Sequence, residues 1–136
     1  MDPLATSMSP ILREFWTLAR LAEGWDGHQA PPPSPLACER AHLVVTLALA
    51  RGLPPARMVP DVMGGLSVYW FGAERTAGGG HRLAASLSID NDGDLVASTV
   101  DRVTQAMDAW DVALEALDST LTRLWTFTAS EARATG

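Results

Sequence analysis

LAASLSIDNDGDLVAS, residues 83–98, has the pattern of two short strands around a tight turn. Leu83, Ala85, Leu87 and Ile89 alternate with small or polar residues, as in a strand with one buried face. Asp92-Gly93 is typical of a two-residue hairpin turn, and such a turn would set Ile89 opposite Val96. We therefore expect an antiparallel hairpin that gathers the apolar side chains of both strands on one face.

A further strand is predicted before this hairpin. In residues 66–71, LSVYWF, apolar Leu66, Val68 and Trp70 fall on alternate positions. The preceding segment, residues 56–65, contains Pro60 and forms at best an edge strand, because proline cannot donate a ladder hydrogen bond. The simplest assembly is a three-stranded antiparallel meander.

Two helices are predicted before the sheet, over residues 10–23 and 35–51. Each begins with a serine that can cap the helix, followed by proline at the first helical position. Each ends before a glycine, which readily adopts the left-handed conformation that terminates helices. These start and stop residues are Ser9-Pro10 with Gly24, and Ser34-Pro35 with Gly52.

A long amphipathic C-terminal helix is predicted after the sheet, because apolar residues recur at heptad spacing and no Gly or Pro interrupts them. The residues of this seam are Val103, Met107, Trp110, Leu114, Leu117, Leu121 and Leu124. The seam either packs on the sheet or forms a homodimer, so a monomer and a dimer through this helix both remain open. The expected fold is an α+β single domain (1–136) in the order α-α-β-β-β-α, with frayed tails at 1–8 and 129–136.

The composition narrows the class of function. The formal net charge is −6 and the chain contains no lysine. A general phosphate-neutralising surface is therefore not expected, and neither P-loop nor Schiff-base chemistry is available. Cys38 is the only cysteine. With no signal peptide and no membrane-spanning run in the sequence, we expect a cytoplasmic protein without membrane contact and without a cofactor.

The turn segment DNDGD, residues 90–94, resembles part of an EF-hand loop. Asp90, Asp92 and Asp94 stand at its first, third and fifth positions, and Asp101 stands at the twelfth. However, Leu95 replaces the glycine of the sixth position, and the flanking segments are predicted strands. A hairpin turn explains these residues, and we expect no metal site.

No catalytic residue is predicted. Cys38, early in the second helix, is interpreted as a small buried hydrophobe, because no motif for an oxyanion hole accompanies it. His42, in the same helix, is interpreted as a hydrogen-bonded residue in the core or at its edge.

Four carboxylates form the leading candidate site: Asp108, Asp111, Glu115 and Asp118. On one continuous helix their spacing of three, four and three residues would place them within an arc of about 80°. Such an acidic strip could bind a basic surface of a partner protein, for example one that itself binds nucleic acid. A merely solvated face is the competing interpretation.

The turn GWDGHQAPPPSP, residues 24–35, is the second candidate. Trp25, Asp26 and His28 could line a small active site or a ligand site. In the competing interpretation Trp25 anchors the turn in the core and Asp26 bonds to the turn backbone, so that only His28 lacks a structural role.

The order EGWDGHQAPPPSPLACERA, GLPPARMVPDVMGGLSVYW and LSIDNDGDL resembles a group of small bacterial and phage-type proteins with no assigned activity. In that group a Gly-Trp-Asp-Gly turn precedes a proline-rich helix start. The likeness covers residues 21–96 and departs from the pattern at Gln29 and at Val62-Met63. It implies a bacterial or mobile-element origin and transfers no functional residue.

These observations favour a non-catalytic protein-binding module. The leading hypothesis is a small acidic inhibitor or adaptor of the antitoxin or anti-defence kind, such as an anti-CRISPR protein from a phage or prophage. The alternatives are a small enzyme or ligand-binding domain built on Trp25, Asp26 and His28, and a structural protein that assembles through its C-terminal helix.

Overall fold

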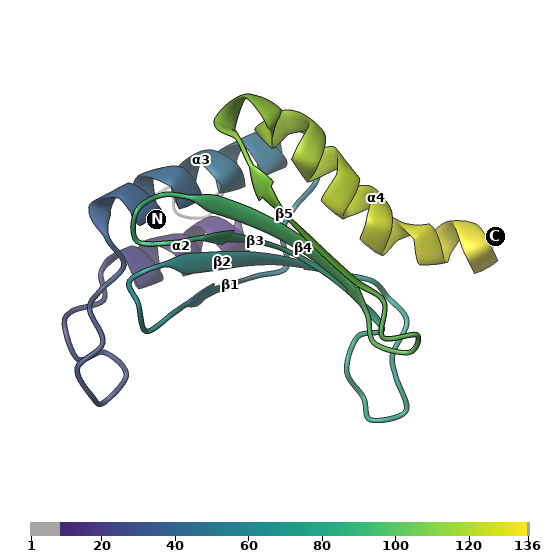
Figure 1. Ribbon diagram of the computed structural model, residues 1–136, viewed down its shortest axis with the longest axis horizontal. Coiled ribbons are helices and arrows are strands. Elements are labelled where there is room, and N and C mark those ends of the chain that lie inside the picture. Colours follow the sequence, from purple (N-terminus) through teal and green to yellow (C-terminus); the bar gives the residue numbers. More distant parts are fainter. Residues whose placement is uncertain (1–8, 136) are drawn as a thin grey trace, which may run out of the picture.

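The computed structural model describes the backbone of residues 9–135 and the side chains of residues 9–130 (Figure 1). Its helices are α2 (Pro10–Ala19), α3 (Pro35–Ala50), the short 3-10 helix η1 (Leu114–Ala116) and α4 (Leu117–Thr135). Its strands are β1 (Arg57–Pro60), β2 (Leu66–Phe71), β3 (Leu83–Ile89), β4 (Leu95–Asp101) and β5 (Met107–Val112). The tail expected at 1–8 lies outside the described residues, whereas the backbone stays helical from the start of α4 to Thr135.

The sheet has five strands, so the predicted three-stranded meander and the order α-α-β-β-β-α are wrong. All neighbouring strands pair antiparallel, in the order β1-β2-β3-β4-β5. The α+β class is confirmed, and β1 lies at an edge of the sheet, as expected for a strand that contains Pro60. The unexpected strand is β5, which occupies the opposite edge and uses residues that the heptad pattern assigned to a helix.

A turn built without glycine or proline explains why β5 was missed. The Oδ1 atom of Asp101 accepts hydrogen bonds from the backbone N–H groups of Val103 (3.0 Å) and Thr104 (3.2 Å). Gln105 adopts a positive φ of 64°, and the N–H of Asp101 donates to the carbonyl oxygen of Ala106 (2.9 Å). The chain therefore reverses here, and α4 begins only at Leu117.

The hairpin between β3 and β4 forms as predicted, but its register differs by one residue. Ile89 lies opposite Leu95, not Val96. The Oδ1 atom of Asp90 accepts the N–H groups of Asp92 (2.8 Å) and Asp94 (3.0 Å), which makes a three-residue loop. Because a shift of one residue exchanges the two faces of a strand, Leu95 is 4% exposed and Val96 is 38% exposed.

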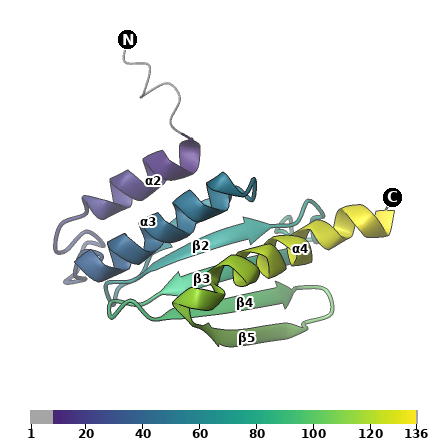
Figure 2. The same cartoon turned by 90° about the horizontal axis from the view of Figure 1, so that it is seen from above.

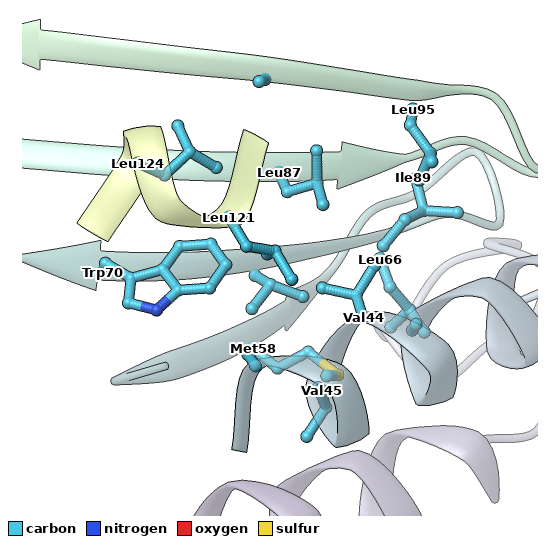
Figure 3. Packing of buried hydrophobic residues seen from close by; sticks show 14 of the residues in the cluster. Val44, Val45, Met58, Leu66, Trp70, Leu87, Ile89, Leu95, Leu121 and Leu124 are labelled. Carbon is cyan, nitrogen blue, oxygen red and sulfur yellow. The ribbon is translucent and has the colours of Figure 1, made fainter. Parts of the chain in front are cut away.

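The helices lie on one side of the sheet, and the core fills the space between them and the strands (Figure 2). Helix α4 packs on β3, β4 and β2, while α3 packs on β2 and β3. Leu117, Leu121 and Leu124 of the predicted seam are buried there, so this part of the seam packs on the sheet. Figure 3 shows Leu121 and Leu124 of α4, together with Val44 and Val45 of α3, meeting the buried side chains of the strands.

Helix α2 lies beside α3 and protects the edge of the sheet. The Oε1 atom of Glu14 accepts a hydrogen bond from the backbone N–H of Met58 in the edge strand β1 (3.2 Å). An unpaired edge strand otherwise presents free backbone groups that invite pairing with another chain. The position of α2 is therefore fixed by a polar contact as well as by its buried residues Ile11 and Phe15.

The two predicted helix starts are confirmed, but only one of the helix ends is. Ser9 and Ser34 cap α2 and α3, accepting the N–H groups of the third residue after each. The end of α3 agrees with the prediction to within one residue. Helix α2 ends four residues earlier than predicted, because the N–H of Arg20 and that of Leu21 already form tighter bonds to the carbonyl three residues back.

Among the described residues, no helix combines the length and the apolar composition that a membrane span requires.

Candidate functional site

The structure does not form the predicted acidic strip on one helix. Asp108 and Asp111 belong to β5, Glu115 to η1 and Asp118 to the first turn of α4. Asp108 and Asp111 are three positions apart on a strand and therefore lie on opposite faces of the sheet. The expectation assumed a helical period of 3.6 residues where the chain has a strand period of two.

Two of these carboxylates are engaged in ion pairs within the molecule. Asp118 pairs with Arg51 at the end of α3. Asp108 pairs with Arg123 of α4 (3.1 Å), and the Arg123 guanidinium group lies 3.8 Å from the centre of the Trp110 ring. These two contacts tie α4 to its neighbours.

The turn at residues 24–30 has the geometry of a structural turn. The Asp26 Oδ1 atom accepts the backbone N–H groups of His28 (3.0 Å) and Ala30 (3.2 Å), which confirms its predicted bonding to the turn backbone. The Trp25 indole N–H donates to the carbonyl oxygen of Pro31 (2.7 Å). Trp25 is only partly buried and lies outside the core cluster, so its predicted role as a core anchor is wrong. His28 is exposed.

A groove lies between α2 and α3. It encloses about 470 Å³ and is open to solvent. Helix α2 provides one wall, and the proline-rich start of α3 with its first two turns provides the other. The lining residues are Phe15, Trp16, Ala19, Pro33, Pro35, Cys38, Glu39 and His42.

Three rings define the aromatic end of the groove. The centres of Phe15 and Trp16 lie 4.9 Å apart at an interplanar angle of 73°. The His42 ring lies 5.4 Å from Phe15 and 5.8 Å from Trp16. Phe15 is 2% exposed, whereas Trp16 is 41% exposed. Phe15 thus forms a buried floor on which the more exposed Trp16 and His42 rings are held.

The polar groups of the groove are few. Burial raises the pKa of the Cys38 thiol, and its sulfur lies 3.9 Å from the carbonyl oxygen of Pro33. The protonated thiol is a poor nucleophile, so this environment does not activate Cys38. Glu39 is exposed at the rim. His42, predicted to lie in the core or at its edge, is exposed and contacts the two aromatic rings instead.

Two hairpin turns position the α3 wall of the groove. The Ser34 N–H donates to the carbonyl oxygen of Gly64 (3.0 Å), in the turn between β1 and β2. The Ser34 hydroxyl donates to the carbonyl oxygen of Asn91 (2.7 Å), in the turn between β3 and β4. Pro33 and Pro35 flank this serine, so the groove residues at the start of α3 are attached to the sheet.

A second polar cluster lies at the other end of the sheet. Arg82 pairs with Asp101 (3.0 Å) and with Glu74 (3.1 Å). The hydrogen bond from Arg82 is the main cause that lowers the pKa of Asp101 to about 2, and N–H groups of Thr104 and Val103 add to it against the effect of burial. This cluster closes a turn and does not line the groove.

Sequence reasoning missed the groove because its walls come from two helices. One signal was present: Trp16 stands outside the apolar stripe of its helix, next to Phe15, where an exposed indole is unusual.

Within the described residues no group of three or more potential metal ligands comes together. Comparisons of the chain with protein-family models, curated proteins and solved structures find no match.

Proposed function

We propose that this chain is a non-catalytic protein-binding module that holds a segment of a partner protein in the groove between α2 and α3. The observation that carries the proposal is the lining of that groove. Its walls are aromatic rings, prolines, an alanine and the thiol of Cys38, with a single carboxylate at the rim. Binding sites typically combine such an apolar surface with few polar groups that set orientation.

The shape of the groove supports a protein partner. An exposed tryptophan supported by a buried ring offers a large apolar area at little cost in side-chain entropy, and tryptophan is enriched among the residues that dominate interface energies. The groove is open rather than enclosed, which suits a side chain presented by a longer segment.

The proposed biological role is that of a small acidic inhibitor or adaptor. The net charge of −6 favours encounter with a basic partner, because long-range attraction raises the association rate. The groove replaces the acidic strip as the proposed contact surface, since the carboxylates of that strip are distributed over β5, η1 and α4.

Selection from a random peptide library on the immobilised protein tests this function. We expect enriched peptides whose affinity falls about tenfold or more in Trp16→Ala, as for an interface hot spot. Met107→Ala is the matched control, because Met107 is a large, exposed apolar residue on β5, away from the groove.

Peptides that bind Trp16→Ala as tightly as the unchanged protein would contradict the proposal. So would the absence of enrichment over a bare surface. Circular dichroism of both variants confirms that each is folded before binding is compared.

A further inference from the structure

We propose that the partner residue seated in the groove is an arginine, with its guanidinium group stacked on Trp16 and paired with Glu39. This inference rests on the proposed function and names the chemistry that the groove recognises. It is carried by three observations: an exposed indole ring, a carboxylate in the same groove that has no partner among the described side chains, and a matching arrangement elsewhere in the same molecule.

The Trp16 ring provides the stacking surface. It is 41% exposed and contacts the ring of Phe15, at a steep interplanar angle of 73°, and the ring of His42. The face of an indole ring attracts cations through its quadrupole, and tryptophan does so more strongly than tyrosine or phenylalanine. Because the supporting rings hold the indole in place, little further entropy is lost when a ligand stacks on it.

The Glu39 carboxylate provides the negative charge. Glu39 precedes His42 by three residues on α3, so the two side chains share the helix face that lines the groove. Among the side chains described between residues 9 and 130, Glu39 has no ion-pair or hydrogen-bond partner. Its charge is therefore available to an incoming cation.

The molecule already contains this combination in an occupied form. Arg123 stacks over the Trp110 ring at 3.8 Å while its Nη2 atom pairs with Asp108 at 3.1 Å. Trp16 and Glu39 offer the same two groups, an indole and a carboxylate, from two different helices. The contact of α4 consists of an arginine, an indole and a carboxylate. The groove presents the indole and the carboxylate, and the arginine would come from the partner.

Arginine fits this arrangement better than lysine does. The guanidinium group is planar, stacks on aromatic rings and is more weakly hydrated than an ammonium group. Its aliphatic stem can pack along apolar surface while the charged end pairs with a carboxylate. Pro33, Pro35 and Ala19 supply such a surface in the groove.

Titration with N-acetyl-arginine amide, followed by NMR of the Trp16 indole N–H, tests the inference. N-acetyl-norleucine amide is the apolar probe, because it keeps an unbranched aliphatic stem and lacks the charged group. We expect arginine amide to shift the Trp16 signal with an affinity about 3-fold or more above that of norleucine amide. Glu39→Gln should lower the arginine affinity about 2–5-fold and leave that of norleucine unchanged.

Glu115→Gln is the matched control, because it removes an exposed carboxylate from η1, outside the groove. Equal affinity of the two probes, or arginine binding that is insensitive to Glu39→Gln, would overturn the arginine assignment. The proposed function would still stand in that case if library peptides depend on Trp16. Library peptides whose affinity does not depend on Trp16 would instead contradict the proposed function, so the two failures are distinguishable.

Discussion

Ser34 connects the first turn of α3 to a hairpin that lies 57 residues away in the chain. Its hydroxyl group donates to the carbonyl oxygen of Asn91 (2.7 Å) and accepts the N–H of Ala37 (3.0 Å). One hydroxyl therefore caps a helix and fixes the wall of the groove to the sheet.

Ser34→Ala removes both hydrogen bonds. We expect the free energy of unfolding, measured in urea, to fall by about 1–2 kcal/mol, because a helix cap and a tertiary bond are lost together. Ser9→Ala is the matched control, since Ser9 caps α2 through one longer bond (3.4 Å). It should cost about 0.5–1 kcal/mol. Equal losses in the two variants would show that the bond to Asn91 contributes nothing.

The register of the β3–β4 hairpin is tested by two neighbouring alanine substitutions. Leu95→Ala should lower the free energy of unfolding by about 2–4 kcal/mol, because Leu95 is buried in the core opposite Ile89. Val96→Ala should cost less than about 1 kcal/mol, because Val96 faces solvent on the other side of the sheet. The reverse ranking would support the register in which Val96 lies opposite Ile89.

The Arg82–Asp101 pair predicts a dependence of stability on pH. The hydrogen bond from Arg82, with smaller effects of the backbone N–H groups of Thr104 and Val103, lowers the pKa of Asp101 from 3.8 to about 2 in the folded protein. The stabilisation is therefore complete above about pH 4 and is lost as the pH falls towards 2. In Arg82→Gln we expect the pKa of Asp101, measured by NMR, to rise towards its ordinary value, and the loss of stability between pH 4 and 2 to become shallower.

Arg20→Gln is the control for this pair, because it removes an exposed arginine near the end of α2. An Asp101 titration that is the same in Arg82→Gln as in the unchanged protein would show that the ion pair does not set this pKa.

The thiol of Cys38 should react slowly in the folded protein. Burial raises its pKa above the ordinary value of 9.0, so less thiolate is present at pH 8. We expect alkylation by iodoacetamide, followed by mass spectrometry, to be about 3-fold or more slower than in urea. Trp16→Ala should accelerate the reaction by opening the groove. Equal rates in the folded and unfolded protein would contradict this account.

The helix starts, which are marked by adjacent residues, were predicted correctly from the sequence. Ser9-Pro10 and Ser34-Pro35 mark the starts of α2 and α3, because a side-chain cap and a proline act within one helical turn. The Asp-Gly hairpin was also predicted, although its register was not. That register depends on the Asp90 carboxylate, which binds two N–H groups of the loop and favours three loop residues over two.

The features that were missed depend on partners distant in sequence. The segment 107–112 contains the heptad residues Met107 and Trp110, yet its pairing with β4 makes it a strand and not a helix. The turn before it rests on Asp101 and Gln105, which carry no glycine or proline signal. The groove could not be predicted, because it exists only where Trp16 of one helix meets His42 of another.

The strand order of the sheet has a consequence for how the molecule folds. Each strand pairs with its neighbour in the chain, so the sheet can form by closing one short loop after another. Helices α2 and α3 precede the sheet in the chain, and they can pack on β1 and β2 only after these strands have been placed. We expect hydrogen-exchange pulse labelling to show β3 and β4 protected before α2. The groove, which needs α2 as one of its walls, would then form only after these two strands have paired.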